Sequence, residues 1–164
     1  MQEVVHPLRP VYNTSSRVLV LGTMPSPASR EAGFYYAHPQ NRFWRVLAKL
    51  FDEPLPQTTS ERTAFALEHH LALWDVLASC EIAGASDASI TNPCPNDLSV
   101  VLNRAPIRCI CTTGKKAAQL YEKFDAALYP HLRHIALPST SSANAAQNLD
   151  DLVKAYEPLK AQLV

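Results

Sequence analysis

Four short apolar runs divide the chain, and longer segments that mix apolar with polar residues separate them. The runs cover residues 17–22, 71–77, 107–112 and 134–137. Their Val, Leu and Ile residues follow one another almost without interruption instead of alternating with polar residues. This pattern favours strands that are covered on both faces, as in a parallel sheet.

The segments between the runs show helical spacing. Residues 41–51 place Phe43, Val46, Leu47 and Leu50 on one side. Further helices are predicted over residues 60–70 with a Ser60 cap, 97–104 with an Asp97 cap, 114–128 and 144–159. Strands that alternate with helices imply right-handed crossovers. We therefore predict an α/β fold, a three-layer α/β/α arrangement around a small four-stranded parallel sheet, formed by one domain over residues 1–164.

The composition fits that prediction without naming a function. A chain of 164 residues with 47% hydrophobic content is long enough for a real core. Its apolar runs are too short to cross a membrane, and its first residues do not resemble a signal peptide. The four cysteines are expected to be reduced, buried thiols of a cytoplasmic protein. Cys109 and Cys111 are expected to point to opposite faces of a strand, so we predict no metal site.

The charges are balanced, with 15 basic and 15 acidic residues. This balance argues against a protein that coats nucleic acid by charge alone. A local basic rim around a site remains compatible with it, because the field in a cleft depends on where the charges lie.

Two predicted strands end in loops of similar composition. One loop is Gly22-Thr23-Met24-Pro25-Ser26-Pro27, and the other is Leu137-Pro138-Ser139-Thr140-Ser141-Ser142-Ala143-Asn144. Either loop alone could be an ordinary proline-rich turn. As a pair at the carboxyl ends of two strands, they could bind successive phosphates of one nucleic-acid strand through N–H and hydroxyl donors.

An aromatic and polar cluster precedes the first long helix, in the order Tyr35-Tyr36-Ala37-His38-Pro39-Gln40-Asn41. Flat rings beside a carboxamide suit a base that is stacked on one face and hydrogen-bonded at its edge. The alternatives are that the tyrosines are packing residues and that Asn41 only caps the helix. Asn41 could also do both.

A third loop, Thr112-Thr113-Gly114-Lys115-Lys116, places two lysines at a helix start. It lacks the full spacing of a P-loop. Lys115 is a candidate phosphate-binding residue, and the alternative is that both lysines are simply solvated.

These segments together resemble the uracil-DNA glycosylase superfamily, and most closely its hypoxanthine-DNA (deoxyinosine) glycosylase branch. The resemblance is carried by Gly22–Ser26, Gly33–Trp44 and the loop 137–144. It implies a four-stranded parallel sheet between helices, no cofactor or metal, and excision of a damaged base from DNA.

The resemblance also assigns residue roles. In the hypoxanthine branch the Asn of the His-Pro-x-Asn segment is catalytic, which corresponds to Asn41. Many superfamily members carry Asn or Asp where this chain has Met24, and His or Asn where it has Leu137. The loop that often inserts a bulky apolar residue into the duplex reads Ser141-Ser142-Ala143 here. A strong wedge is therefore not expected, and mispaired or single-stranded targets should be preferred.

The resulting prediction is a monofunctional glycosylase that removes a deaminated base, hypoxanthine, from DNA by means of a water positioned by Asn41. The base-binding candidates are Thr23, Met24, Phe34, Tyr35, Tyr36 and His38. The phosphate-binding candidates are Pro25, Ser26, Ser139, Thr140, Ser141, Ser142 and Lys115. A monomer is expected. The alternatives are a uracil or mismatch glycosylase of the same fold, a nucleic-acid-binding module without catalysis, and an α/β domain with another small ligand.

Overall fold

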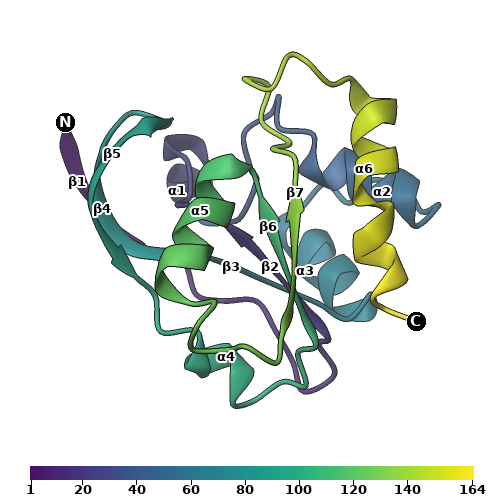
Figure 1. The fold of residues 1–164 in the computed structure, drawn as a ribbon. Helices are drawn as coiled ribbons and strands as arrows, with labels where there is room; N and C mark the ends of the chain where they lie inside the picture. Colours follow the sequence, from purple (N-terminus) through teal and green to yellow (C-terminus); the bar gives the residue numbers. More distant parts are fainter.

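The four predicted strands form one parallel sheet in the computed structural model, which describes residues 1–164 (Figure 1). The strands are β2 (Val18–Gly22), β3 (Leu71–Asp75), β6 (Cys109–Thr113) and β7 (Arg133–Leu137), in the order β3-β2-β6-β7. Every neighbouring pair is parallel. All residues of β2 and β3 are buried, which explains why these strands are apolar on both faces.

Helices cover both faces of this sheet, which confirms the predicted α/β class. The helix α5 (Lys115–Phe124) lies on one side, and α2 (Phe43–Leu50), α3 (Thr59–Glu68) and α6 (Leu149–Ala161) lie on the other (Figure 1). The predicted apolar side of α2 is buried, including Phe43 and Leu47. One cluster of 36 buried apolar residues joins the layers.

Two helices begin elsewhere than the sequence pattern predicted. The cap of α3 is Thr58 and not Ser60, because Thr58 and Glu61 form a reciprocal capping box. Likewise α6 begins after Asn148, which pairs with Asp151 in the same way. The residues from 138 to 148 are therefore a long loop beside the site, where a helix from residue 144 was expected. The predicted helix over 97–104 is reduced to α4 (Ser99–Leu102).

A second sheet was not predicted. It is antiparallel, with the order β1-β4-β5, and consists of β1 (Gln2–Val5), β4 (Leu77–Ala83) and β5 (Ser86–Pro95). β5 is mostly exposed and polar, and its two prolines fit an edge strand, where a missing N–H costs no ladder bond. The pairing of β4 with β5 contains register shifts, so no regular alternation marks either strand in the sequence.

The short helix α1 (Pro27–Ala32) was also missed, although the sequence carries its signals. Ser26 caps it, Pro27 occupies the first turn, and Gly33 ends it with φ of 74°. This is the usual distribution of Ser, Pro and Gly at helix ends. Ser26 therefore caps α1 and also belongs to the loop after β2.

Two predictions about the cysteines were wrong. Cys94 is exposed, whereas the other three thiols are buried. Cys109 and Cys111 lie on the same face of β6, with their sulfur atoms 4.0 Å apart, because residues two apart in a strand share a face. No group of three or more His, Cys, Asp or Glu side chains is arranged to hold a metal ion.

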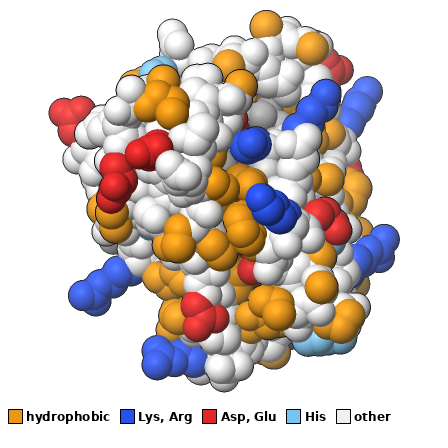
Figure 2. Space-filling view, turned by 60° about the vertical axis from the view of Figure 1, so that its left-hand side comes forward, with side chains coloured by type: hydrophobic (Ala, Val, Ile, Leu, Met, Phe, Trp, Pro, Cys, Tyr) orange, Lys and Arg blue, Asp and Glu red, His pale blue; other side chains and the backbone are white.

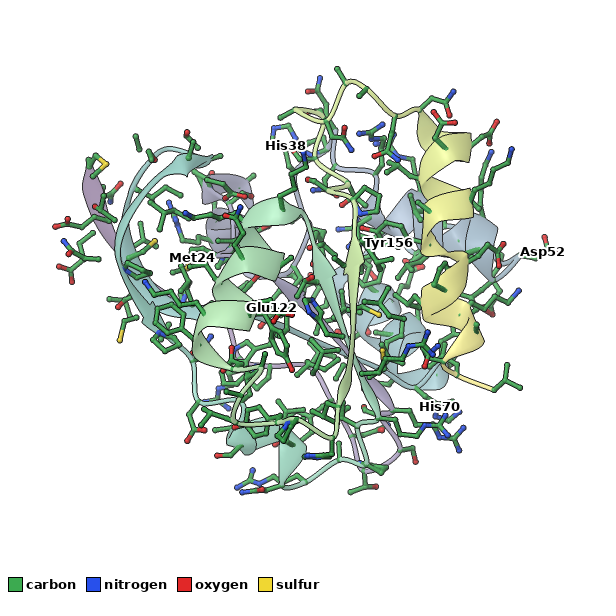
Figure 3. All side chains as sticks on the ribbon, viewed as in Figure 1. Met24, His38, Asp52, His70, Glu122 and Tyr156 are labelled. Atoms are coloured by element: carbon green, nitrogen blue, oxygen red, sulfur yellow. The ribbon has the colours of Figure 1, made fainter.

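The parallel strands all end at one side of the molecule, where the loops described below meet. Figure 3 places His38 at this end and His70 at the opposite one. Positive and negative side chains are scattered among apolar ones on the face that Figure 2 presents, and no single charge sign dominates it. None of the helices has the length and apolar character needed to span a bilayer.

Candidate active site

A cavity of about 600 Å³ lies at the carboxyl ends of the parallel strands. Each strand contributes a residue at or just beyond its end: Gly22 from β2, Asp75 from β3, Thr113 from β6 and Ser139 after β7. Such an end of an open α/β sheet, where loops diverge, is the usual ligand site. The turn between β4 and β5, which includes Gly84, forms a further wall.

Asn41 lines this cavity and directly precedes Arg42, the N-cap of α2. Its Oδ1 accepts a hydrogen bond from the Phe43 N–H and another from the Thr140 hydroxyl, each at 2.9 Å. Because a backbone N–H can only donate, the oxygen of the carboxamide is assigned and both of its lone pairs are used. The Nδ2 group makes no hydrogen bond within the chain and is therefore the end of the carboxamide that is left for a ligand. The prediction that Asn41 caps the helix is wrong, because the N-cap of α2 is Arg42; the role of Asn41 as a site residue stays a prediction.

The loop after β7 is fastened by Arg42. The guanidinium of Arg42 donates to the carbonyl oxygens of Ser141 and Asn144 at 2.9 Å each and to that of Gln147. The hydroxyls of Ser139 and Ser141 accept backbone N–H bonds from Ser141 and Ala143. Their hydroxyl hydrogens remain available as donors. This loop, including Ser142, forms one wall of the cavity.

The aromatic residues of the predicted cluster have different positions. Tyr36 lines the cavity, its ring stacks on Phe43 at 3.8 Å between centroids, and its hydroxyl is 3.0 Å from the Thr113 hydroxyl. Tyr35 also touches the cavity but is only 2% exposed. Burial raises the pKa of both phenols above the ordinary value, so they act as neutral groups.

Phe34 is a correction to the predicted base-binding set. It does not line the cavity and is buried against Tyr35 and Trp44. The reason is that Gly33 ends α1 and turns the chain inward, so that Phe34 becomes part of the core. Tyr35 has little free surface for stacking, because its hydroxyl donates to the Arg9 carbonyl at 2.7 Å and its ring lies near His6.

The loop after β2 lies across from the loop after β7. Thr23, Met24, Pro25 and Ser26 all line the cavity, as does His38. The Ser26 hydroxyl accepts from the Ser29 N–H as the cap of α1 and donates to the Ser29 hydroxyl, each at 3.2 Å, so its hydrogen is already used within the chain. His38 is exposed at the rim, where its Nδ1 accepts from the Gln40 N–H.

Lys115 is the second residue that the structure separates from the others. Its side chain is exposed and does not line the cavity, because the first residue of α5 points outward from the turn at Gly114. No lysine is among the 22 residues that line the cavity.

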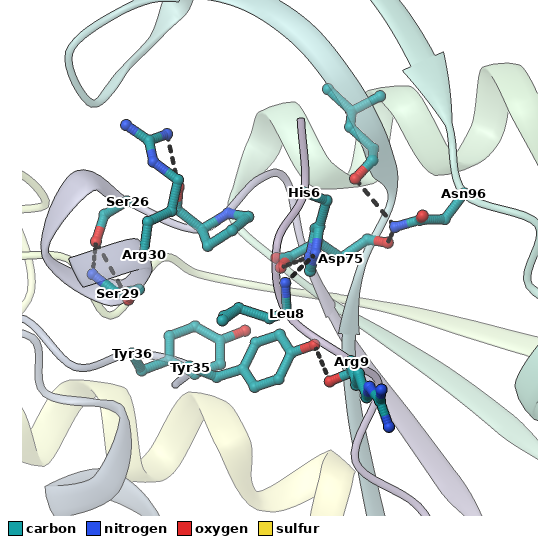
Figure 4. A network of polar contacts seen from close by, with 12 residues as sticks. His6, Leu8, Arg9, Ser26, Ser29, Arg30, Tyr35, Tyr36, Asp75 and Asn96 are labelled. Atoms are coloured by element: carbon teal, nitrogen blue, oxygen red, sulfur yellow. Dashed lines mark hydrogen bonds and ion pairs between the residues drawn. The ribbon is translucent and has the colours of Figure 1, made fainter. Parts of the chain in front are cut away.

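The sequence patterns missed Asp75, the one buried carboxyl group among the lining residues. Its Oδ2 is 2.8 Å from Nε2 of His6, and the two side chains are 6% and 3% exposed (Figure 4). Burial raises the pKa of Asp75, and the hydrogen bond from His6 opposes that shift. A charged residue that directly follows a fully apolar run, Leu71-Ala72-Leu73-Trp74, was the signal that could have found it.

The cavity at the carboxyl ends of the parallel strands is thus lined by a Pro-Ser loop and by His38 and Asn41 of the His-Pro-x-Asn segment. The sequence matches the family model of the Uracil DNA glycosylase superfamily over residues 9–160. The chain belongs to that superfamily and is a DNA glycosylase.

The chain is similar to two hypoxanthine DNA glycosylases from archaea. It is 33% identical to the one from Methanosarcina acetivorans over 141 residues, which cover 82% of this chain and 84% of the relative. It is 31% identical to the one from Methanosarcina barkeri over 112 residues, or 67% of this chain and 71% of the relative.

The fold is similar to a solved structure as well. A protein from Methanosarcina acetivorans, described as a candidate uracil DNA glycosylase and solved in solution by NMR, superposes with a TM-score of 0.82. The sequence identity is 26%, and the match covers 99% of both chains.

Proposed function

We propose that this protein removes hypoxanthine from DNA by hydrolysing its N-glycosidic bond, and that it leaves an intact abasic site. The observation that carries the proposal is the position of Asn41 between the two Pro-Ser loops, with its amide hydrogens free at the cavity. The archaeal relatives named as hypoxanthine DNA glycosylases support the choice of base.

Asn41 positions the attacking water in this proposal. Its Nδ2–H donates to the water oxygen, since its Oδ1 is already saturated by Phe43 and Thr140. Cleavage develops positive charge on the sugar and negative charge on the base, so a strong nucleophile is not needed and positioning is the main contribution. The water oxygen bonds to the anomeric carbon as the bond to the base breaks, and the released proton neutralises the departing base.

The serine-rich loops hold the backbone of the flipped nucleotide. Ser139, Ser141 and Ser142 present hydroxyl donors toward the cavity, while the hydroxyl hydrogens of Ser26 and Thr140 are used within the chain. Phosphates held by these loops favour an oxocarbenium-like sugar through their negative charge. Thr23, Met24 and Tyr36 lie around the base, and His38 lies at the rim. Phe34 and Lys115 are not part of this proposal, because neither lines the cavity.

The reaction is monofunctional in this proposal. A lyase of the Schiff-base type needs an amine beside the anomeric carbon, and the cavity lining contains no lysine. We further propose a monomer and a reducing cytoplasmic environment, with which four unpaired cysteines are compatible.

A base-release assay tests the proposal. Labelled duplexes that carry one inosine, one uracil or one xanthine are incubated with the protein, and half of each sample is then heated in alkali. The proposal expects strand cleavage on inosine only after alkali. Release of uracil alone would overturn the assignment of the base, and cleavage without alkali or a borohydride-trapped adduct would overturn the monofunctional mechanism. Tight binding to abasic DNA without any release would favour a binding module.

A further inference from the structure

The carboxyl group of Asp87 lines the cavity but has no part in the mechanism above. Asp87 lies near the tip of the hairpin of β4 and β5, which curves beside the parallel sheet in Figure 1 and forms one wall of the cavity. The side chain is open to solvent at this wall, and none of the four ion pairs of the chain includes it. An acidic group is thus available on the same cavity as the carboxamide of Asn41.

The tip of the hairpin is fixed by contacts of its own. Ala83 and Ser86 are paired across the turn, and Gly84 adopts a φ of 57°. The Ser89 hydroxyl accepts from the Ala83 N–H at 2.8 Å and donates to the Ser86 carbonyl at 2.6 Å. These contacts enclose Asp87 in the sequence, so its backbone belongs to a defined wall of the cavity.

The neighbours of Asp87 place it beside the part of the cavity that is assigned to the base. The Thr23 hydroxyl, after β2, and the carboxyl group of Asp75, at the end of β3, both lie close enough to change its protonation. Lys116 faces it from α5. Thr23 is one of the residues that lie around the base in the proposed function, so Asp87 is within reach of the same ligand.

These surroundings favour the protonated form of Asp87. Its pKa is raised above the ordinary carboxyl value, mainly because the walls of the cavity displace part of its hydration. The charge of Lys116 opposes this shift, and the charge of Asp75 reinforces it. A carboxyl group that keeps its proton closer to neutral pH, in a cavity, meets the requirements of a general acid.

We propose that Asp87 is a general acid that protonates N7 of the departing hypoxanthine. N7 carries no hydrogen and shares the five-membered ring with N9, the atom that is bound to the sugar. As the C1′–N9 bond breaks, its electron pair remains on the base, and the proton of Asp87 moves to N7, so that the base leaves as a neutral molecule. The water held by Asn41 bonds to C1′, and the proton that it releases restores the acid form of Asp87 through solvent.

This inference rests on the proposed glycosylase function and makes Asp87 a catalytic residue with a preference for purines. Uracil has two ring nitrogens, of which one is bound to the sugar and the other already carries a hydrogen. It therefore has no ring nitrogen that could take up the proton of Asp87. The acid accelerates the departure of hypoxanthine and gives no such help to uracil.

The test is single-turnover release of hypoxanthine from an inosine duplex across a pH series. Asp87→Asn retains the shape and can donate a hydrogen bond, but it cannot transfer a proton. At the pH optimum of the wild type it should slow release at least about 100-fold, with an unchanged melting temperature. Asp52→Asn is the matched control and should react at the wild-type rate, because Asp52 is exposed, lies outside the cavity and has a φ of 52°, which Asn tolerates well.

The pH profile identifies the group that supplies the proton. Wild-type release should fall as the pH rises and Asp87 loses its proton, and Asp87→Asn should lack this basic limb. Lys116→Gln should move the limb to higher pH, because the lysine charge lowers the pKa of Asp87. The titratable groups around Asp87 are Asp75 of β3, Cys80 of β4 and Lys116 of α5, and the cavity lining adds Tyr35, Tyr36 and His38.

A second substrate separates proton transfer from a structural role of Asp87. A duplex with 7-deazainosine has a C–H group in place of N7 and is otherwise the same shape. The advantage of the wild type over Asp87→Asn should disappear on this substrate, because the atom that receives the proton is absent. A structural effect of the substitution would slow both substrates alike.

Three results would overturn the inference. They are equal rates of the wild type and Asp87→Asn on inosine, a basic limb that Asp87→Asn retains or Lys116→Gln leaves in place, and an advantage of the wild type on 7-deazainosine as large as on inosine. Failure of the wild-type protein to release any base at any pH would instead overturn the proposed function itself, so the two failures are distinguishable.

Discussion

The hydroxyl of Thr140 donates to Oδ1 of Asn41 at 2.9 Å and so joins two loops that lie 99 residues apart in the chain. Thr140 follows β7, and Asn41 precedes α2. Together with the Phe43 N–H, this bond fixes the plane of the carboxamide and determines that its N–H group faces the cavity. The orientation of the Asn41 carboxamide is thus set by a buried residue that the sequence analysis named only as a phosphate-binding candidate.

Replacing Thr140 tests this relationship. Thr140→Val removes the donor with little change of shape, so the carboxamide of Asn41 is held by one hydrogen bond instead of two. We expect the single-turnover rate of base release to fall about tenfold, because a small misplacement of a positioning group is costly. Thr140→Ser retains the hydroxyl and should stay within about twofold of the wild type. Equal rates for the valine and serine variants would contradict this role.

Arg42 allows a test of the loop itself. Arg42→Lys removes the planar fork that donates to four carbonyl groups of the loop, at Thr140, Ser141, Asn144 and Gln147. Hydrogen exchange in residues 139–147 should become faster, and the affinity for abasic-site DNA should fall several-fold. Arg45→Lys is the control, because Arg45 is exposed and donates only to the Asn41 carbonyl. Unchanged exchange in the Arg42 variant would show that the loop is held by other contacts.

Substitutions of Gly22 and Asp75 should have coupled effects on the free energy of unfolding. A methyl group at Gly22 would approach Oδ1 of Asp75 to 2.5 Å, so Gly22→Ala should destabilise the protein by about 1–3 kcal/mol in urea unfolding. Most of that cost should vanish in the Asp75→Ala background, where the carboxylate is absent. A double-mutant cycle gives this coupling directly. If the destabilisation by Gly22→Ala and that by Asp75→Ala were additive, the added methyl group would not clash with the Asp75 carboxylate.

The buried carboxyl group of Asp125 should make the folding stability depend on pH, and this residue lies outside the candidate site. It follows α5, is 3% exposed, and its Oδ2 has no partner. Burial, reinforced by the charge of Asp97, raises its pKa to about 7. The folded state therefore holds a proton that the unfolded state releases near pH 4, and folding stability falls as the pH rises from about 4 to about 7.

Replacing Asp125 by Asn removes this titration. Asp125→Asn should be more stable than the wild type by about 1–2 kcal/mol at pH 8 and nearly equal to it at pH 4. Urea unfolding at the two pH values measures the difference. A gain that is the same at both pH values would contradict the assigned titration.

The duplex context of the target base gives a further prediction. The loop segment Ser141-Ser142-Ala143 offers no bulky apolar side chain to replace a flipped base, and flipping costs least where pairing is weak. Inosine opposite a poorly pairing base, or in a single strand, should be released faster than inosine opposite cytosine. Equal single-turnover rates would indicate that another residue fills the gap in the duplex.

The sequence patterns predicted correctly those strands and helices in which either every residue or one whole side is buried. β2 and β3 are buried at every residue, so their apolar runs were unambiguous, and α2 has a clear apolar side. The antiparallel sheet was not predicted from the sequence because β5 is mostly exposed and polar and contains two prolines. Its edge position tolerates such residues, and its pairing depends on β4 rather than on its own composition.

The sequence patterns named cavity residues that lie in one stretch of sequence, and they missed cavity residues that only the fold brings together. Asn41 and the serine-rich loops lie in motifs, so their residues could be named in advance. Asp75 and His6 are 69 residues apart, and they meet because β1 pairs with β4 and Val11 pairs with Leu73 of β3. Phe34 was misassigned for the opposite reason, because a motif residue can serve the core.

The most direct test of the central claim is chromatographic detection of free hypoxanthine released from an inosine duplex by the wild type and by Asn41→Ala. The wild type should release the base in a single turnover and leave an alkali-labile site. Asn41→Ala should be slower by at least about 100-fold, while it still binds abasic-site DNA. Release of hypoxanthine at the wild-type rate by the Asn41→Ala variant would contradict the role of Asn41, and no hypoxanthine from the wild type would contradict the proposed function.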